Sequence, residues 1–196
     1  SSLIGGRSGN RGRCAQACRM SYNLINTEDN SIKEGFLLSP KDMCTIDELR
    51  DIIESGTASL KIEGRMKRVE YVAGVVKNYR TAVDDILNMK TDKFSQKSSK
   101  EELMQLFNRE GFNRGYLHGN PGIDLMAIHN PKNTGLLLGN VKKDNLVVLN
   151  TSIELKDGVS AGNKGFTVSK IINDKGQTVN KAEKGEKVRL FPMEYR

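Results

Sequence analysis

Short apolar runs alternate with helical stripes between residues 36 and 87, and this alternation constrains the fold most. Residues 36–39 and 59–64 have the length and apolar content of buried strands, and a stretch with apolar residues at three- and four-residue steps follows each. This order implies parallel strands joined by right-handed crossovers. Because two parallel strands do not make a stable sheet, we expect the remaining strands upstream of residue 1.

Two helices are predicted between and after these strands. Thr45 and Glu48 fit a capping box at the start of the first helix, and Gly56 fits its stop signal. The first apolar stripe consists of Ile46, Leu49, Ile52 and Ile53. The second, longer stripe consists of Val69, Val72, Ala73, Val76, Val83, Ile86 and Leu87. Residues 90–99 are polar and typical of a linker, and a short capped helix is predicted after them.

From residue 130 the pattern changes to short strand-like runs that are separated by turns such as Lys175-Gly176 and Lys184-Gly185. This pattern indicates a small all-β domain, a barrel or a sandwich. We therefore expect three parts. Residues 1–89 form the C-terminal part of an α/β barrel with a cysteine- and arginine-bearing loop, residues 90–129 a linker with a short helix, and residues 130–196 a small β-barrel.

The net charge of +7 is concentrated near the start of the chain. Arg7, Arg11, Arg13 and Arg19 lie in the first twenty residues, where there is no Asp or Glu. Such a loop attracts an anion, either a nucleic acid or a carboxylate or phosphate substrate, although charge also serves solubility. No apolar run approaches the roughly 20 residues that a membrane span needs, and no signal peptide is visible. We expect a cytoplasmic protein without a membrane partner.

The chain has three cysteines, Cys14, Cys18 and Cys44. An odd number without a secretory signal argues against a disulfide framework and leaves metal ligation, reactivity or idle thiols. The spacing of Cys14 and Cys18 is one residue wider than a typical zinc-knuckle pair. Because arginines lie nearby, they would lower the thiol pKa values and offset the charge of a metal cluster. All three cysteines are candidate metal ligands.

The predicted strand at residues 59–64 carries charge on one side. Side chains alternate along a strand, so Lys61, Glu63 and Arg65 face one way while Leu60 and Ile62 face the other. Inside a parallel barrel, the place that tolerates a charged face is the C-terminal mouth, where active sites lie. We take Lys61 and Glu63 as candidate catalytic residues and Arg65 as a candidate substrate- or RNA-binding residue. The alternative is an internal salt-bridge layer without catalysis.

Other polar residues have weaker support. Ser39 and Lys41 end the earlier predicted strand and would face the same mouth. The full set of candidate substrate- or RNA-binding residues is Arg7, Arg11, Arg13, Lys41, Arg65 and Lys67. His118 and His129 are distant from the cysteines in sequence, and we expect surface or packing roles for both. No Ser–His–Asp set, zinc-protease helix motif or phosphate-binding loop is present.

The chain closely resembles peptidase family U32, the collagenase-like proteases, in three long segments: GGRSGNRGRCAQACR, LLSPKDMCTIDEL and GTASLKIEGRMKRVEYVAGVVKNYRTAVD. FNRGYL is similar to a fourth family element, and the resemblance covers roughly residues 1 to 120. The resemblance implies an α/β fold, namely the C-terminal portion of a TIM-type (β/α)8 barrel followed by a small all-β barrel domain. That last domain resembles the second domain of translation elongation factors.

The resemblance also implies a cofactor and a choice of reactions. In related members four cysteines hold a 4Fe-4S cluster. Two of them would lie upstream of this chain and two would be among the three cysteines here, with Cys14 favoured. Members are associated with proteolysis of collagen-like substrates, with hydroxylation of tRNA wobble uridine or rRNA bases that requires prephenate, or with ubiquinone hydroxylation. A second family subunit is an expected partner.

We favour iron–sulfur-dependent hydroxylation of tRNA or rRNA, with RNA as the partner. The first alternative is a collagenase-like peptidase that acts on a collagen-like peptide, with Glu63 as its base or metal ligand. The second is a non-catalytic RNA-binding module.

Overall fold

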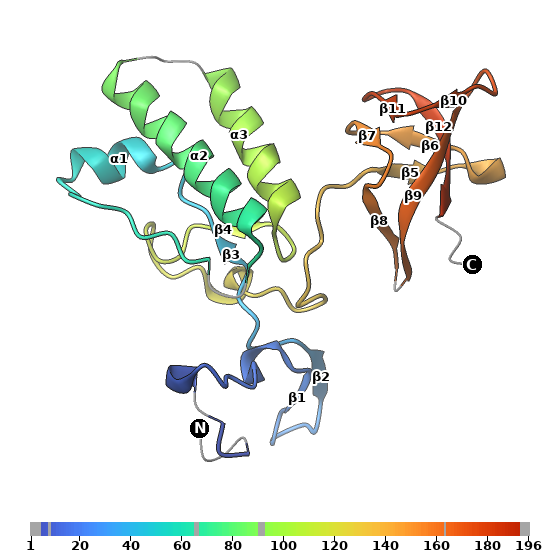
Figure 1. Cartoon of the computed structure of the whole chain (residues 1–196). Helices are drawn as coiled ribbons and strands as arrows, with labels where there is room; N and C mark the ends of the chain where they lie inside the picture. The colour runs from blue at the N-terminus through green and yellow to red at the C-terminus, as the bar shows by residue number, and fades with distance from the viewer. Residues whose placement is uncertain (1–4, 8, 65–66, 90–92, 163, 193–196) are drawn as a thin grey trace. The chain divides into compact units, whose positions relative to one another are not determined.

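The computed structural model describes residues 5–7, 9–64, 67–89, 93–162 and 164–192. The chain is mixed α/β and divides into two compact units, Ser1–Gly135 and Leu136–Arg196 (Figure 1). Helices α1–α3 belong to the first unit, and strands β5–β12 belong to the second. Among the described residues, no helix combines the length and the apolar composition that crossing a membrane requires.

The first unit begins with short turns and a hairpin. Single 3-10 turns lie at Gly9–Arg11 (η1) and Ala17–Arg19 (η2), and they precede strands β1 (Tyr22–Ile25) and β2 (Ile32–Gly35), which pair antiparallel. The connection between the two strands contains an Asx turn, in which the side-chain oxygen of Asn26 accepts a hydrogen bond from the backbone N–H of Glu28. The sequence pattern did not predict this hairpin.

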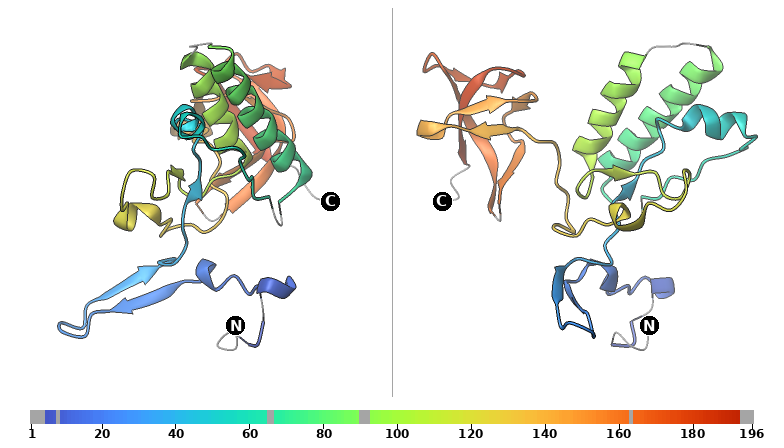
Figure 2. Two further views of the ribbon diagram at one scale, coloured as in Figure 1. Left: turned by 90° about the vertical axis from the view of Figure 1, so that its left-hand side faces the viewer. Right: turned by 180° about the vertical axis from the view of Figure 1, so that it is seen from behind.

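Three helices make up most of the remaining first unit: α1 (Leu49–Glu54), α2 (Val69–Leu87) and α3 (Lys93–Leu106). α2 and α3 pack side by side (Figures 1 and 2). They pack closely because α2 carries Gly74, whose missing side chain leaves room for Leu106 of α3. The core between the helices contains Cys44, Ile46, Val75 and Leu103.

The two predicted strands of this unit are wrong. Residues 36–39 form a turn in which the Ser39 N–H donates to the Phe36 carbonyl, and residues 59–64 have no regular secondary structure. The parallel pair that does form is shorter and involves other residues, β3 (Asp42–Met43) beside β4 (Phe112–Asn113). An apolar run becomes a strand only beside a partner edge, and no described strand pairs with residues 59–64.

Two predicted helix starts are also wrong. α1 begins at Leu49 without a side-chain cap, because the Thr45 hydroxyl lies 3.5 Å from the Tyr79 hydroxyl and Glu48 pairs with Arg114. Tertiary partners thus take both members of the predicted capping box. The predicted linker over residues 90–99 is also incorrect from residue 93, where α3 begins, and residues 90–92 lie outside the described residues.

The bounds predicted for α2 are confirmed, but its predicted buried face is wrong. Val69, Val72 and Val76 of the apolar stripe are 81%, 39% and 45% exposed. Val75 and Asn78 are the buried residues of α2 instead. Asn78 is accommodated there because its side-chain amide donates to the Gly74 carbonyl and to a carboxylate oxygen of Glu102 on α3.

The second unit is built from short strands around its own core. Its strands are β5 (Gly139–Val141), β6 (Val147–Leu149), β7 (Ile153–Glu154), β8 (Gly158–Ala161), β9 (Lys164–Asn173), β10 (Thr178–Val179), β11 (Lys181–Ala182) and β12 (Lys187–Pro192). The main sheet has the open order β10-β9-β12-β6-β5, with β8 also on β9, and β7 pairs with β11. The predicted turns at Gly176 and Gly185 are confirmed, each with positive φ. The core is apolar throughout: Val147, Leu149, Ile153, Val168, Ile171, Ala182 and Val188.

Candidate functional site

Two cysteines of the N-terminal segment lie on an exposed loop shaped by η2. Gln16 precedes this turn in the left-handed region, with φ of 53°, and its backbone N–H donates to Cys14 Sγ over 3.4 Å. Cys18 lies inside the turn. The loop therefore presents two accessible sulfur atoms, one of which already accepts a backbone hydrogen bond of the kind that stabilises ligand thiolates.

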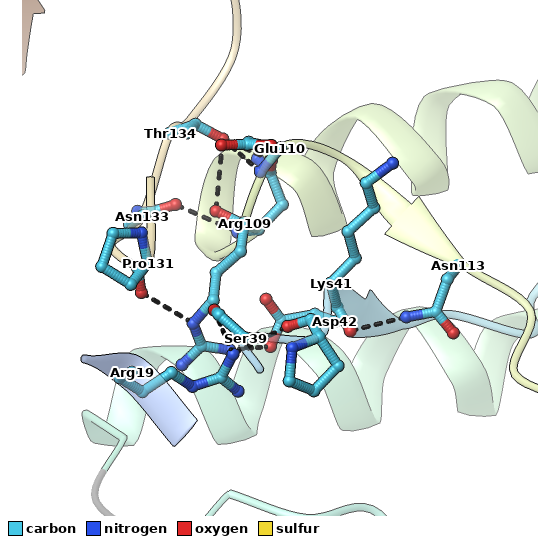
Figure 3. A network of polar contacts seen from close by, with 12 residues as sticks. Arg19, Ser39, Lys41, Asp42, Arg109, Glu110, Asn113, Pro131, Asn133 and Thr134 are labelled. Atoms are coloured by element: carbon cyan, nitrogen blue, oxygen red, sulfur yellow. Dashed lines mark hydrogen bonds and ion pairs between the residues drawn. The ribbon is translucent and has the colours of Figure 1, made fainter. Parts of the chain in front are cut away.

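Hydrogen bonds from Arg19 connect this loop to the interior of the first unit. Its Nη1 donates to Ser39 Oγ over 2.6 Å and to the Pro40 carbonyl over 2.8 Å (Figure 3). Ser39 is fully buried, so the guanidinium is held at a fixed point. Burial lowers the pKa of Arg19, and repulsion from Arg109 lowers it further, whereas Cys18 acts in the opposite direction.

Arg109 reaches the same point from the end of α3. Its Nη1 lies 2.6 Å from Asp42 Oδ1 in an ion pair whose side chains are only 15% and 20% exposed. Its Nε donates to the Pro131 carbonyl over 2.9 Å, and its guanidinium stacks 4.6 Å from the centre of the Phe107 ring. The second oxygen of Asp42 is buried and has no hydrogen-bond partner among the described residues.

Lys67 is the third cation. Its ammonium stands over the rings of Phe107 and Tyr71, 5.3 Å from the centre of the latter. Within the described part of the chain no carboxylate or hydrogen-bond acceptor contacts it directly, and its positive charge is offset by the aromatic faces and, at longer range, by Asp42. Burial lowers its pKa to about 8, and the charge of Arg109 contributes to that shift.

We call Arg19, Lys67 and Arg109 the cation cluster. Asp42 is the one carboxylate that contacts it among the described residues. Positive charge therefore exceeds negative charge by two in a half-buried place, where water screens it poorly. The arrangement can hold an anion next to the cysteine loop, because Arg19 directly follows Cys18.

Four of the other cations predicted to bind substrate or RNA are described, and they are not part of this cluster. Arg7, Arg11 and Arg13 are exposed on the cysteine loop, where Arg7 Nε donates to the Arg13 carbonyl over 3.1 Å. Lys41 is half-buried, and its side chain points away from Arg109 (Figure 3). Of the predicted cations that the structure describes, Lys67 alone belongs to the cation cluster.

The candidate catalytic pair lies on the irregular segment 59–64. Lys61 and Glu63 are both exposed, and the face that strand alternation predicted for them does not exist because the segment is not a strand. Arg65, predicted on the same face, lies outside the described residues. The roles assigned to this pair stay predictions.

Cys44 differs from the other two cysteines. It is buried in the helical core, and the Tyr79 hydroxyl lies 3.7 Å from its sulfur. Burial raises the pKa of its thiol, so Cys44 stays protonated at neutral pH. No group of three or more Cys, His, Asp or Glu side chains in the described part of the chain is placed to hold a metal ion. The three predicted ligands are therefore not gathered at one point.

Sequence reasoning missed Arg109 and Asp42, which are 67 positions apart in the chain. It also missed a second ion pair, in which the carboxylate of buried Glu48 lies 2.7 Å from Arg114 Nε and 3.8 Å from His118 Nε2. His118 and His129 are both exposed. The sequence singled out the FNRGYL segment, which contains Arg114, but it did not identify Glu48 as the partner of Arg114.

Comparison with known proteins gives one family. Residues 1–127 match the sequence pattern of peptidase family U32. The chain is 35% identical to tRNA hydroxylation protein P1 of Bacillus subtilis (strain 168) over 165 residues, which cover 78% of this chain and 39% of that protein. It is 32% identical to a 23S rRNA 5-hydroxycytidine synthase of Escherichia coli (strain K12) over 199 residues, which cover 96% of this chain and 30% of that protein.

A third relative has a different name. The chain is 37% identical to a collagenase of Porphyromonas gingivalis over 113 residues, which cover 57% of this chain and 31% of that protein. The chain thus spans well under half the length of these three relatives. No solved structure matches it.

Proposed function

The chain belongs to peptidase family U32, and from this premise we propose that it is part of an enzyme that hydroxylates a base of tRNA or rRNA in the cytoplasm. One observation carries the proposal: the alignment with the rRNA hydroxycytidine synthase covers 96% of the chain and so extends through both units. The alignment with the collagenase covers 57% and is too short to include both. A β unit that an RNA-modifying relative shares favours RNA as the substrate.

The exposed basic loop supports RNA as the partner. Arg7, Arg11 and Arg13 are all accessible, and phosphates of an RNA backbone attract such a group independently of sequence. The loop also carries the two exposed cysteines, so an RNA strand that binds there would lie next to their sulfur atoms. Phosphate contacts of this kind position the RNA and leave base choice to other residues.

Cys14 and Cys18 are the residues of this chain that fit a 4Fe-4S cluster, with two further thiolates from outside it. Both are exposed on a backbone that turns through a left-handed residue, and a backbone N–H already points at Cys14. A bound cluster would supply one-electron chemistry. Arg19 would offset negative charge beside Cys18 while Ser39 holds it in place. The proposal leaves Cys44 in the core as a protonated thiol.

The barrel architecture of the complete protein is part of the same proposal. We propose that the first unit completes a TIM-type barrel with strands from outside this chain. The parallel pair β3–β4 supports this, as does the apolar face of α2, whose Val69 and Val76 are exposed in the structure. We also propose that the second unit closes into a small β-barrel, because β9 pairs with β8 along its first half and with β12 along its second.

Nucleoside analysis tests the function directly. Deletion of the gene should remove one hydroxylated pyrimidine from total tRNA or rRNA digests, measured by mass spectrometry, and the complete protein should restore it. Growth with and without a prephenate supply tests the predicted co-substrate in the same assay. If the digests are unchanged by the deletion, the proposal fails. RNA binding by iron-free protein with unchanged digests would indicate the RNA-binding module instead.

Proteolysis is the second candidate, and the similarity to the collagenase favours it. In that case Glu63 would act as a base or metal ligand, and Glu63→Gln would abolish gelatin cleavage by the purified complete protein while the charge-matched control Glu101→Gln would not. Glu101 is an exposed residue of α3. Cleavage that survives Glu63→Gln would come from other residues or from a contaminant.

A further inference from the structure

We propose that the cation cluster is a binding site for a small dianionic oxyanion group, either a phosphate monoester or a pair of neighbouring carboxylates. Its residues come from three separate places in the sequence: Arg19 after the cysteine loop, Lys67 before α2 and Arg109 after α3. Arg19 and Arg109 lie together (Figure 3), and Lys67 shares the Phe107 ring with Arg109. The proposal goes beyond the RNA reaction, because ligand binding at this site can be measured without iron and without RNA.

The charge balance gives the charge of the ligand. Asp42 forms an ion pair with one of the three cations, Arg109, and within the described part of the chain the direct contacts of Arg19 and Lys67 are with neutral groups. A half-buried cation without a counter-ion costs free energy, because burial removes water that would otherwise solvate it. A ligand with two negative charges restores neutrality. A phosphodiester of an RNA backbone carries one charge and leaves the cluster unbalanced.

The donors also suit an oxyanion. The guanidinium of Arg19 makes its two hydrogen bonds through Nη1 alone, so the N–H groups on Nε and Nη2 have no partner in the described part of the chain. The ammonium of Lys67 likewise keeps all three donors. Planar N–H pairs and a mobile ammonium are the donors that recognise carboxylate and phosphate oxygens.

The environment fixes these donors before a ligand arrives. Ser39 and Pro40 hold Arg19, and Phe107 lies against both Lys67 and Arg109. Preorganised donors lose little conformational freedom on binding. The low pKa of Lys67 fits the same picture, because burial disfavours its charged form and the positive charges of Arg109 and Arg19 disfavour it further.

Calorimetric titration of the complete protein tests this site. The probes are inorganic phosphate, malonate and dimethyl phosphate, the last carrying the single charge of a phosphodiester. We expect phosphate, malonate or both to bind at least roughly tenfold more tightly than dimethyl phosphate. Preference between phosphate and malonate then identifies the ligand class. Equal binding of all three probes, or no binding, overturns the proposal.

Variants locate the site. Lys67→Met should weaken binding of the preferred dianion by roughly tenfold, because it removes one charged donor and keeps the apolar stem. Lys77→Met, at an exposed lysine of α2, is the matched control and should bind as the original protein does. If Lys67→Met binds with unchanged affinity, the assignment is wrong. Because no turnover is measured, loss of the RNA reaction does not affect this result.

The pH dependence gives an independent readout. Malonate stays a dianion between about pH 7 and about pH 9.5, whereas Lys67, whose pKa is about 8, loses its proton over that range. The groups that face Lys67 are Arg19, Arg109, Asp42 and Tyr71, and burial raises the pKa of Tyr71. Malonate affinity should therefore fall several-fold at the higher pH in the original protein and stay flat in Lys67→Met. A fall of equal size in both proteins contradicts the proposal.

Discussion

At the scale of single residues, the site consists of three cations and one carboxylate, which forms an ion pair with one of them. Asp42 is held by the short parallel pair β3–β4 and forms its ion pair with Arg109, while its second oxygen lacks a partner in the described part of the chain. Among the described residues, Lys67 makes its direct contacts with aromatic rings and none with a carboxylate. These two features predict opposite effects on stability when each charge is removed.

Removal of the carboxylate should destabilise the protein. Asp42→Asn leaves Arg109 charged, mostly buried and without an anion, which we expect to cost about 2 kcal/mol in the free energy of unfolding. Asp84→Asn breaks a similarly short Arg–Asp pair on α2 whose members are 58% and 54% exposed, and it should change stability much less. Urea unfolding of the two variants compares them. Equal losses would mean that burial does not strengthen the Asp42–Arg109 pair.

Removal of the ammonium should stabilise the protein at neutral pH. The pKa of Lys67 is lower in the folded state than its ordinary value, so the folded chain binds fewer protons and the free energy of unfolding rises with pH from about 8 toward 10.5. Lys67→Met removes this penalty and should add about 1 kcal/mol near pH 7, after allowance for solvent screening of a half-buried group. The gain should shrink near pH 10. A gain that does not depend on pH would assign the effect to packing.

At the scale of elements, the sequence predicted periodic features well and partners poorly. The limits of α2 and the turns at Gly176 and Gly185 follow from local residues, and both are correct. Residues 59–64 are not a strand, although their apolar content is typical of one, because a strand needs hydrogen-bond partners that local sequence cannot supply. Asp42 and Arg109 were missed for the same reason, since nothing local links positions so far apart.

A substitution at one glycine can test how the strands of the second unit are paired. A Cβ at Gly139 in β5 would overlap the Val148 carbonyl oxygen of the paired strand β6, whereas nothing lies within 4 Å of a Cβ at Gly158 in β8. Gly139→Ala should therefore destabilise this unit by about 2 kcal/mol or more, because the backbone must shift. Gly158→Ala should be neutral or slightly stabilising. Thermal unfolding distinguishes them, and an unaffected Gly139→Ala variant would contradict the register of β5 and β6.

At the scale of the whole molecule, the chain combines a chemistry-bearing unit with a separate β unit. All candidate thiols and the cation cluster lie in Ser1–Gly135. The second unit has its own apolar core around Leu149, Ile171 and Val188. Because this core draws no residue from the first unit, the two units have separate sources of stability.

This separation can be tested by producing the second unit without the first. A chain of residues 136–196 should fold alone and should unfold cooperatively in urea, with a midpoint close to that of the same unit in the complete protein. Resolved amide signals in a heteronuclear NMR spectrum would report a packed core. A collapsed spectrum for this piece would show that the β unit depends on the rest of the protein.

The central claim is that the exposed cysteines of an arginine-rich loop, and not the buried one, serve an RNA-hydroxylating centre. The most direct measurement is iron content together with the hydroxylated nucleoside in cells that carry Cys14→Ser, Cys18→Ser or Cys44→Ala in the complete protein. We expect the first two variants to lose both iron and the modified nucleoside, and Cys44→Ala to keep both and lose about 1 kcal/mol of stability. Loss of iron in Cys44→Ala with retention in Cys14→Ser and Cys18→Ser would contradict it.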